Sequence, residues 1–328
     1  MTVCRRNYFV RSIELTIVVW LLIVSTFSIL GVTHNTPHLK PSASAAADLP
    51  MLFRGSQPAV EVMVNGQGPF LFAIDTGATD EARVDSSLVA RLELRVSGTS
   101  THSDGSNKKT KLGIVRLDSL SVGGLEFRNV KAATRDYNRL NLPHIDGILA
   151  FDLFHGHLLT LDYPAKCVRF WRGELPAVDG GEVLPLKRVH SHPAVELTIG
   201  SRKVAAEIDS GNVAHSFLFP ASLVERLSLA TEPTSIGKAK TITNELEIME
   251  AQLRDNVRLG KYEFTQPLIS FPAPFPFANI GNRFLNQFAI TFDQKNNRVR
   301  FVRPGNDKRN STGTQQQFGN QGAESVRD

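Results

Sequence analysis

Two aspartates stand in nearly the same local sequence at widely separated points of the chain. Asp75 lies in the segment Ile-Asp-Thr-Gly, and Asp209 lies in the segment Ile-Asp-Ser-Gly. A single Asp-Thr-Gly is usually a turn, because all three residue types are favoured there. Two copies, each directly after an apolar run, place ionisable groups where burial is costly. The pattern predicts that Asp75 and Asp209 form a catalytic carboxylate pair.

Two carboxylates that face each other can hydrolyse a peptide bond without a metal or a covalent intermediate. Like charges at short range resist simultaneous ionisation, so the pair shares one proton. The charged carboxylate can take a proton from a water that attacks the peptide carbonyl, while the protonated one donates to the carbonyl oxygen. Because such a pair titrates as a unit, the sequence assigns no separate acid or base role to either aspartate. No cofactor and no metal are expected.

The residues that follow each aspartate fit the same chemistry. Gly77 and Gly211 allow the backbone to turn tightly and approach the carboxylates, whose charge their N–H groups can stabilise. The hydroxyls of Thr76 and Ser210 are placed to hydrogen-bond between the two halves of the chain, with local turn bonding as the alternative. These four residues are therefore predicted to support the active-site loops.

The chain repeats itself around the two motifs. Four segments recur in the same order and at similar offsets, which is the signature of an internal duplication. The matched segments are 58–62 with 193–197, 72–77 with 206–211, 122–127 with 259–264, and 160–170 with 291–301. Four collinear matches are hard to obtain by chance. The repeat predicts two related halves that pack face to face and bring both aspartates to their interface.

Most of the repeated segments alternate or run apolar, as β-strands do. Asn65-Gly66 is a signal for a tight hairpin turn, and short helices are expected at 86–92 and 221–227. The expected fold is mainly β, with two barrel-like lobes related by an approximate twofold axis. The N-terminal lobe is expected at 49–180 and the C-terminal lobe at 181–304.

The N-terminal segment carries the signals of an exported protein. Arginines precede an apolar run at 15–32, which is long for a cleaved signal and nearly long enough to span a bilayer. Residues 1–33 are predicted as a hydrophobic helix that anchors the chain through 12–32, with a cleaved signal peptide as the alternative. With either an anchor or a cleaved signal peptide, the residues after 33 are expected outside the cytoplasm, in the periplasm or secreted. Residues 34–48 are predicted as a linker and 305–328 as a disordered tail.

Composition argues against several other classes of protein. The formal charge is +5, but Lys and Arg are spread along the chain, so no nucleic-acid partner is expected. Cys4 and Cys167 flank the apolar run, so neither a disulfide nor a cysteine metal site is expected. The His-x-His pairs at 155–157 and 190–192 are predicted as surface side chains, because a metal needs three or four converging ligands. Cys167 is expected to be a small buried apolar residue.

The paired Ile-Asp-Thr/Ser-Gly segments resemble the active-site loops of aspartic proteases. Segment 145–149 is similar to the strand of that family beneath the first loop, and segment 279–281 stands in the matching place beneath the second. The resemblance covers roughly residues 50–303 and is to bacterial exported members of the retropepsin-like and pepsin-like group. It implies a bilobal acid-protease fold and an endopeptidase that acts on peptide or protein substrates.

Three positions depart from the usual pattern of this family. Ala150 stands where glycine is usual, Ala78 follows the first motif as in retroviral enzymes, and Asn212 follows the second motif. Loss of a hydroxyl near Asp75 removes one stabiliser of its charge, so we expect activity nearer neutral pH than in pepsin-like enzymes. Segment 97–113 is expected to be a polar flap hairpin without a tyrosine.

Two further functions compete with proteolysis. A catalytically inactive peptide-binding protein on the same fold could hold extended peptides between the lobes through backbone hydrogen bonds, and a structural envelope protein is the other alternative. A Ser-His-Asp triad is disfavoured, because the chain lacks Gly-x-Ser-x-Gly. The apolar segment 271–277 is interpreted as core or loop packing rather than pocket lining. The sequence does not predict an oligomeric state.

Overall fold

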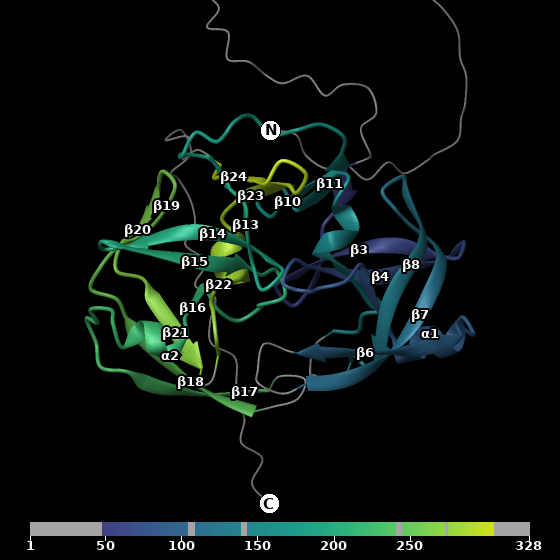
Figure 1. Ribbon diagram of the computed structural model, residues 1–328, viewed down its shortest axis with the longest axis horizontal. Helices are drawn as coiled ribbons and strands as arrows, with labels where there is room; N and C mark the ends of the chain where they lie inside the picture. Colours follow the sequence, from purple (N-terminus) through teal and green to yellow (C-terminus); the bar gives the residue numbers. More distant parts are fainter. Residues whose placement is uncertain (1–47, 104–108, 139–142, 241–244, 273–274, 305–328) are drawn as a thin grey trace, which may run out of the picture.

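The apolar segments of the sequence form three β-sheets in the computed structural model of the protein (Figure 1). The structure describes residues 48–103, 109–138, 143–240, 245–272 and 275–304. Strands dominate and the helices are short, so the prediction of a mainly β protein is confirmed. The predicted anchor at 1–33, the tail at 305–328 and all of the linker except Asp48 lie outside the described residues. Within those ranges, no helix has the length and apolar character needed to cross a bilayer.

The eight-stranded sheet contains the first aspartate motif. Its strands, in spatial order, are β2 (Leu52–Arg54), β3 (Gln57–Val64), β4 (Gln67–Asp75), β9 (Gly147–Ala150), β5 (Ala82–Asp85), β8 (Leu125–Arg135), β7 (Lys109–Val122) and β6 (Val96–Ser103). Asn65 and Gly66 turn the chain between β3 and β4 with φ of 50° and 74°, as the Asn-Gly signal predicted. Helix α1 (Ser86–Arg91) follows β5, and the Asp85 side chain caps it by accepting a hydrogen bond from the N–H of Ser87.

The ten-stranded sheet contains the second motif. Its strands, in spatial order, are β17 (Thr234–Lys240), β18 (Glu245–Gln252), β21 (Leu268–Pro272), β16 (Phe217–Leu218), β22 (Ala278–Ile280), β15 (Arg202–Ile208), β14 (His192–Ile199), β19 (Val257–Leu259) and β20 (Tyr262–Phe264), and β13 (Lys187–Val189) also pairs with β14. Helix α2 (Ala221–Val224) is shorter than the predicted 221–227, because the N–H groups of Arg226 and Leu227 bond to carbonyls three residues back. Helix α3 (Asn282–Leu285) follows β22.

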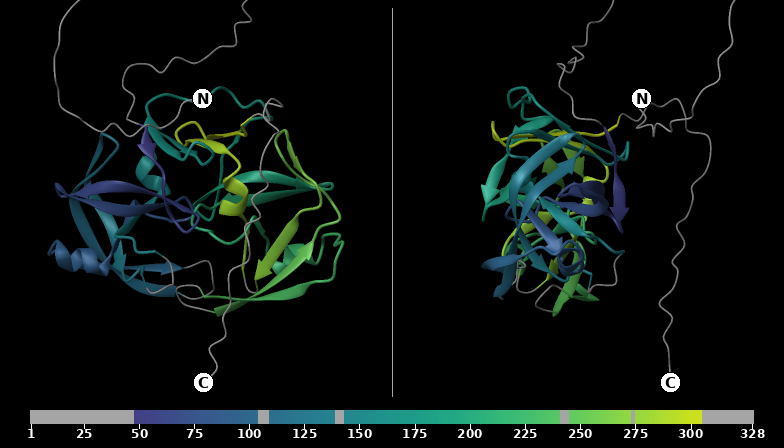
Figure 2. Two further views of the ribbon diagram at one scale, coloured as in Figure 1. Left: turned by 180° about the vertical axis from the view of Figure 1, so that it is seen from behind. Right: turned by 90° about the vertical axis from the view of Figure 1, so that its right-hand side faces the viewer.

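The six-stranded sheet draws strands from both halves of the sequence and lies between the other two sheets (Figure 2). Its strands, in spatial order, are β1 (Leu49–Pro50), β11 (Cys167–Trp171), β10 (Leu158–Asp162), β23 (Ala289–Asp293), β24 (Arg298–Val302) and β12 (Val183–Pro185). At its centre, Thr160 on β10 faces Thr291 on β23, with the two hydroxyl oxygens 2.9 Å apart. These threonines are counterparts in the sequence repeat, so the repeated segments meet each other here.

A large apolar core lies beneath the two aspartate motifs. The rings of Phe217, Phe284 and Phe288 pack together in the C-terminal half, with centroid distances of 5.2 Å and 5.3 Å for successive pairs. Cys167 is fully buried in β11, as expected for a small apolar residue. Burying one large apolar side chain contributes about 1.5–3 kcal/mol, so the strands that end at the aspartates are firmly anchored.

Candidate active site

Each aspartate stands at the end of a strand whose neighbour runs parallel to it. Asp75 is the last residue of β4, which pairs with β9, and Asp209 directly follows β15, which pairs with β22. The preceding residues, Ile74 and Ile208, are fully buried. Each strand is therefore held in the core while its polar end emerges at the edge of the sheet. The two halves present their carboxylates from equivalent places.

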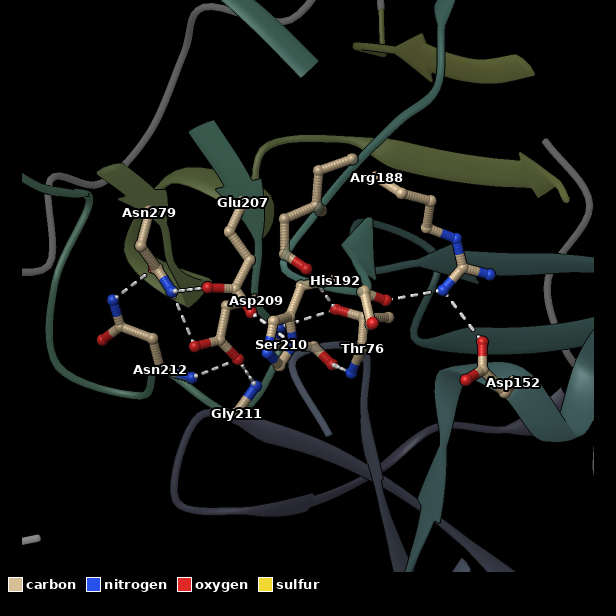
Figure 3. Close-up of polar contacts among 12 residues, drawn as sticks. Thr76, Asp152, Arg188, His192, Glu207, Asp209, Ser210, Gly211, Asn212 and Asn279 are labelled. Atoms are coloured by element: carbon tan, nitrogen blue, oxygen red, sulfur yellow. Dashed lines mark hydrogen bonds and ion pairs between the residues drawn. The ribbon is translucent and has the colours of Figure 1, made fainter. Parts of the chain in front are cut away.

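The two motifs are tied to each other by reciprocal hydrogen bonds (Figure 3). The Thr76 hydroxyl accepts from the N–H of Ser210 and donates to the carbonyl of Ile208, at 2.9 Å and 2.6 Å. The Ser210 hydroxyl accepts from the N–H of Thr76 and donates to the carbonyl of Ile74, at 2.9 Å and 2.8 Å. Both side chains are fully buried. These hydroxyls therefore bond between the halves of the chain, and not within their own turns.

The glycine of each motif packs against the aspartate of the other. A Cβ atom on Gly77 would collide with the carboxylate of Asp209, and a Cβ atom on Gly211 would lie 2.6 Å from Oδ1 of Asp75. Any larger residue at either position would displace the opposite carboxylate. Both aspartates and both glycines line one cavity of about 630 Å³.

Burial and mutual repulsion set the charge of the pair. Burial raises the pKa of Asp75 to about 6, and the negative charge of Asp209 adds to this shift, while Arg83 and the N–H of Gly77 oppose it. Burial also raises the pKa of Asp209, against a hydrogen bond from Asn279 and backbone bonds that favour its ionised form. A pair with raised pKa values retains a proton in mildly acidic solution.

Three donors converge on Asp209 (Figure 3). Its Oδ1 accepts from the backbone N–H groups of Gly211 at 2.8 Å and Asn212 at 3.2 Å. Its Oδ2 accepts from the Nδ2 of Asn279 at 2.7 Å. Hydrogen bonds to a carboxylate are stronger than those between neutral groups, so this arrangement stabilises a negative charge on Asp209.

The departures at Ala78, Ala150 and Asn212 are explained by how each loop packs on the strand beneath it. Ala78 and Ala150 are both buried in one small apolar cluster under the first loop. Under the second loop, a Cβ atom on Gly281 would lie only 2.6 Å from the side chain of Asn212. The same Cβ atom would lie 2.5 Å from the backbone carbonyl oxygen of His215, so both the chain and Asn212 require glycine there, whereas the first loop packs over the methyl group of Ala150.

An ion pair that the sequence analysis missed lies in the same cavity. The Nδ1 of His192 is 3.0 Å from Oε1 of Glu207, whose side chain is only 4% exposed. Burial raises the pKa of Glu207 to about 7, against the opposing effect of His192. Burial lowers the pKa of His192, but the contact with Glu207 and the negative charges of Glu207, Asp209 and Asp75 together outweigh burial, and the net shift is upward. The prediction of a surface histidine was therefore wrong for His192.

The hairpin that carries His192 is tied to the first half of the chain. Arg188 on β13 bonds through Nη1 to Oδ1 of Asp152 and to the carbonyl of Ser191, at 2.9 Å and 2.8 Å (Figure 3). Asp152 lies in the 3₁₀ helix η1 (Phe151–Phe154), which directly follows β9 beneath the first motif. This contact fixes the chain four residues before His192 against the opposite half.

The remaining walls of the cavity are polar on one side and aromatic on the other. The cavity is also lined by Thr79, Asp80, Arg83, Ser100, Thr101, His102, His190, Phe275, Pro276 and Phe277. The ring of Phe277 lies 5.4 Å from that of His190. The interpretation of 271–277 as core or loop packing holds for the buried Phe271 and was wrong for 275–277. Across the described ranges, no cluster of three His, Cys, Asp or Glu side chains is placed to hold a metal.

Comparison with known proteins gives a match for the part of the chain that contains the first aspartate motif. Residues 60–153 match the model of a family described as aspartyl protease. The matched stretch runs from β3 into η1 and includes the motif at Asp75 together with the parallel strand β9. A comparison with curated proteins gave no match. The family match supports the placement of this chain among the aspartyl proteases.

Proposed function

We propose that the protein is an aspartic endopeptidase that hydrolyses peptide bonds with a water activated by Asp75 and Asp209. The observation that carries the proposal is the reciprocal packing of Gly77 against Asp209 and of Gly211 against Asp75 around one cavity. This arrangement holds the backbone of each loop close to the opposite carboxylate. The family match over 60–153 adds independent support for the first loop.

The reaction follows from one proton shared between two acids. In the first step, the ionised carboxylate takes a proton from the water, whose oxygen forms a bond to the peptide carbonyl carbon. The protonated carboxyl group donates its proton to the carbonyl oxygen at the same time. In the second step, the C–N bond breaks as the leaving nitrogen receives the proton that the first carboxylate took from the water. One hydroxyl of the intermediate re-forms the carbonyl group and returns its proton to the other carboxylate, which restores the singly protonated pair. The hydrogen bonds between Thr76 and Ser210 keep the two loops in register throughout.

The proposed fold is a bilobal acid-protease fold with lobes at 49–180 and 181–304. The pairing of Thr160 with its repeat counterpart Thr291, and of Thr76 with Ser210, supports a twofold relation between the lobes. We further propose, from the sequence signals at 1–33, an exported protein of the retropepsin-like and pepsin-like group that is anchored in or released from the inner membrane. Its substrates would then be peptides or proteins outside the cytoplasm.

The decisive experiment is cleavage of an unfolded protein by the purified full-length chain. Casein is incubated with the wild-type chain, with Asp75→Asn and with Asp209→Asn, and the products are identified by mass spectrometry. Each variant is expected to lose at least about 100-fold in rate, because each carboxyl group transfers a proton in the reaction. Asp118→Asn serves as the control, since Asp118 is exposed on β7.

Two outcomes would contradict the proposal. Equal cleavage by the wild-type chain and both active-site variants would show that another enzyme, or another site, is responsible. Binding of peptides by the wild-type chain without any cleavage between pH 3 and pH 8 would instead favour the catalytically inactive peptide-binding protein.

A further inference from the structure

The two aspartates of the pair are not surrounded equally. Asp209 accepts three hydrogen bonds, from the backbone of Gly211 and Asn212 and from the side chain of Asn279. In contrast, no protein group in the described part of the chain hydrogen-bonds to the buried Oδ1 of Asp75. The difference lies in the side chains that the sequence places beside each aspartate.

Strand register shows where the difference arises. In the first half, Ala73 on β4 faces Ile148 on β9, two residues before Asp75. At the corresponding place in the second half, Glu207 on β15 faces Asn279 on β22. An apolar pair beside one aspartate is therefore replaced by a polar pair beside the other. The two loops have the same backbone plan but different electrostatic surroundings.

The orientation of the Asn279 amide is fixed by its partners. Its Nδ2 donates to Oδ2 of Asp209 at 2.7 Å and lies 3.5 Å from Oε2 of Glu207. Its Oδ1 accepts from the Nδ2 of Asn212 at 2.9 Å. Rotation of the amide by half a turn would bring its oxygen toward two carboxyl groups and lose the bond from Asn212. Glu207 is itself held by His192, so the donor remains directed at Asp209.

We infer that Asp209 is the charged member of the singly protonated pair, that Asp75 carries the proton, and that Asn279 is the positioning residue that fixes this distribution. The inference rests on the proposed function, in which it assigns the two roles. Asp209 takes the proton of the attacking water, and Asp75 donates its proton to the peptide carbonyl oxygen. The pair is then asymmetric before any substrate binds.

The charged groups around the pair affect the ionisation of both aspartates. Arg83 on β5 favours the ionised form of Asp75, and His192 on β14 favours the ionised form of both aspartates. Glu207 on β15 lies beside Asp209, and on β6 the His102 Nδ1 is 3.4 Å from Asp80. The ionised form of Asp75 is favoured by Arg83, which acts through space, and by the single backbone N–H of Gly77. The three bonds to Asp209 are direct contacts of 3.2 Å or less and therefore dominate.

The distribution of the proton can be measured by NMR on the full-length chain labelled with ¹³C at the aspartate carboxyl carbons. The Asp75→Asn and Asp209→Asn variants assign the two signals. The expected result is a pH range in which the carbon of Asp209 has the chemical shift of a carboxylate while that of Asp75 has the shift of a protonated acid. The reverse assignment, or equal intermediate shifts for both carbons, would overturn the inference.

A variant tests the role of Asn279. In Asn279→Leu, the titration of Asp209 is expected to move upward by about one pH unit or more, because its strongest side-chain donor is gone. Asn286→Leu is the matched control, since Asn286 is exposed at the end of α3 and should leave both titrations in place. An unchanged titration of Asp209 in a folded Asn279→Leu protein would show that Asn279 does not position the charge. Should that variant fail to fold, the wild-type titration still decides where the proton lies.

The NMR result and the cleavage result are independent of each other. A chain that cleaves no protein, but holds its proton on Asp75, would contradict the proposed function and leave the charge distribution standing. A chain that cleaves casein through both aspartates, but holds its proton on Asp209, would support the proposed function and overturn the assignment of roles.

Discussion

The Nδ1 of His192 lies 3.0 Å from Oε1 of Glu207, and the two side chains form an ion pair at the wall of the cavity that contains both aspartates. Glu207 occupies the place that Ala73 has in the first half of the repeat. A buried acid beside the pair makes the stability of the fold depend on pH, because its pKa differs from that of an unfolded glutamate.

The Glu207→Gln substitution is expected to change how stability varies with pH. The folded-state pKa of Glu207 is raised to about 7 from an ordinary value of 4.5, so the folded protein binds this proton more tightly than the unfolded chain does. The resulting stabilisation is complete below about pH 4.5 and is lost as pH rises through about 7, with an amplitude on the order of 3 kcal/mol. His192, whose pKa is also raised, acts in the same direction.

Chemical denaturation at a series of pH values measures this effect. Relative to Glu207→Gln, the wild-type protein should lose stability between about pH 4.5 and pH 7. Glu61→Gln is the control, because Glu61 is exposed on β3. A constant difference between wild type and Glu207→Gln across this range would contradict the predicted raised pKa.

Hydrolysis is expected to fall off on the alkaline side of about pH 6. The reaction requires one protonated carboxyl group, and the pKa of Asp75 is raised to about 6 by burial and by the charge of Asp209. Above this value both aspartates ionise, and the rate should fall about tenfold for each pH unit. A pH–rate profile of kcat/KM with casein-derived peptides tests this. A maximum well below pH 4, or a rate that stays constant up to pH 8, would contradict it.

The Gly211→Ala substitution is expected to abolish most of the activity. The added methyl group would lie 2.6 Å from Oδ1 of Asp75, so the carboxyl group or the loop must move. A misplacement of about 1 Å in a reacting group costs on the order of 100-fold in rate. Gly156→Ala is the control, because a Cβ atom on Gly156 meets open space. Full activity in Gly211→Ala would show that the loop can relax without moving Asp75.

The Ser210→Ala substitution is expected to destabilise the fold as well as the site. It leaves the N–H of Thr76 and the carbonyl of Ile74 without the hydroxyl that bonds to both, and unpaired buried groups cost about 1–3 kcal/mol. The loss is measured as a lower denaturation midpoint with an unchanged dependence on denaturant concentration. Ser222→Ala, in the exposed part of α2, should stay within about 0.5 kcal/mol of wild type. An equal stability of Ser210→Ala and Ser222→Ala would be the contrary result.

The sequence predicts the parts of the site that are local and repeated. Asp75 and Asp209 stand out because each follows a buried isoleucine and precedes a small polar residue and a glycine. A repeat also predicts which segments are equivalent, and the pairing of Thr160 with Thr291 agrees with it. These features depend on short-range geometry and on the alternation of apolar residues, which the sequence displays directly.

The parts of the site that the sequence analysis missed depend on how residues far apart in the sequence are paired in the sheets. His192 and Glu207 are fifteen residues apart on neighbouring strands, and their contact depends on the register that places Ala194 opposite Glu207. The one available signal was Glu207 itself, an acid in an apolar run where the first copy has Ala73. Phe275 and Phe277 gave no such signal, since an apolar loop segment reads the same whether it fills the core or lines a cavity.

The pairing of β10 with β23 limits how the chain can be divided. These two strands are adjacent in the middle of one sheet, so a cut after residue 180 would leave an open edge on each fragment. An open edge of this kind readily pairs with another strand. The first fragment could then form a homodimer by joining β10 to β10 of a second copy, with Thr160 facing Thr160 across the seam.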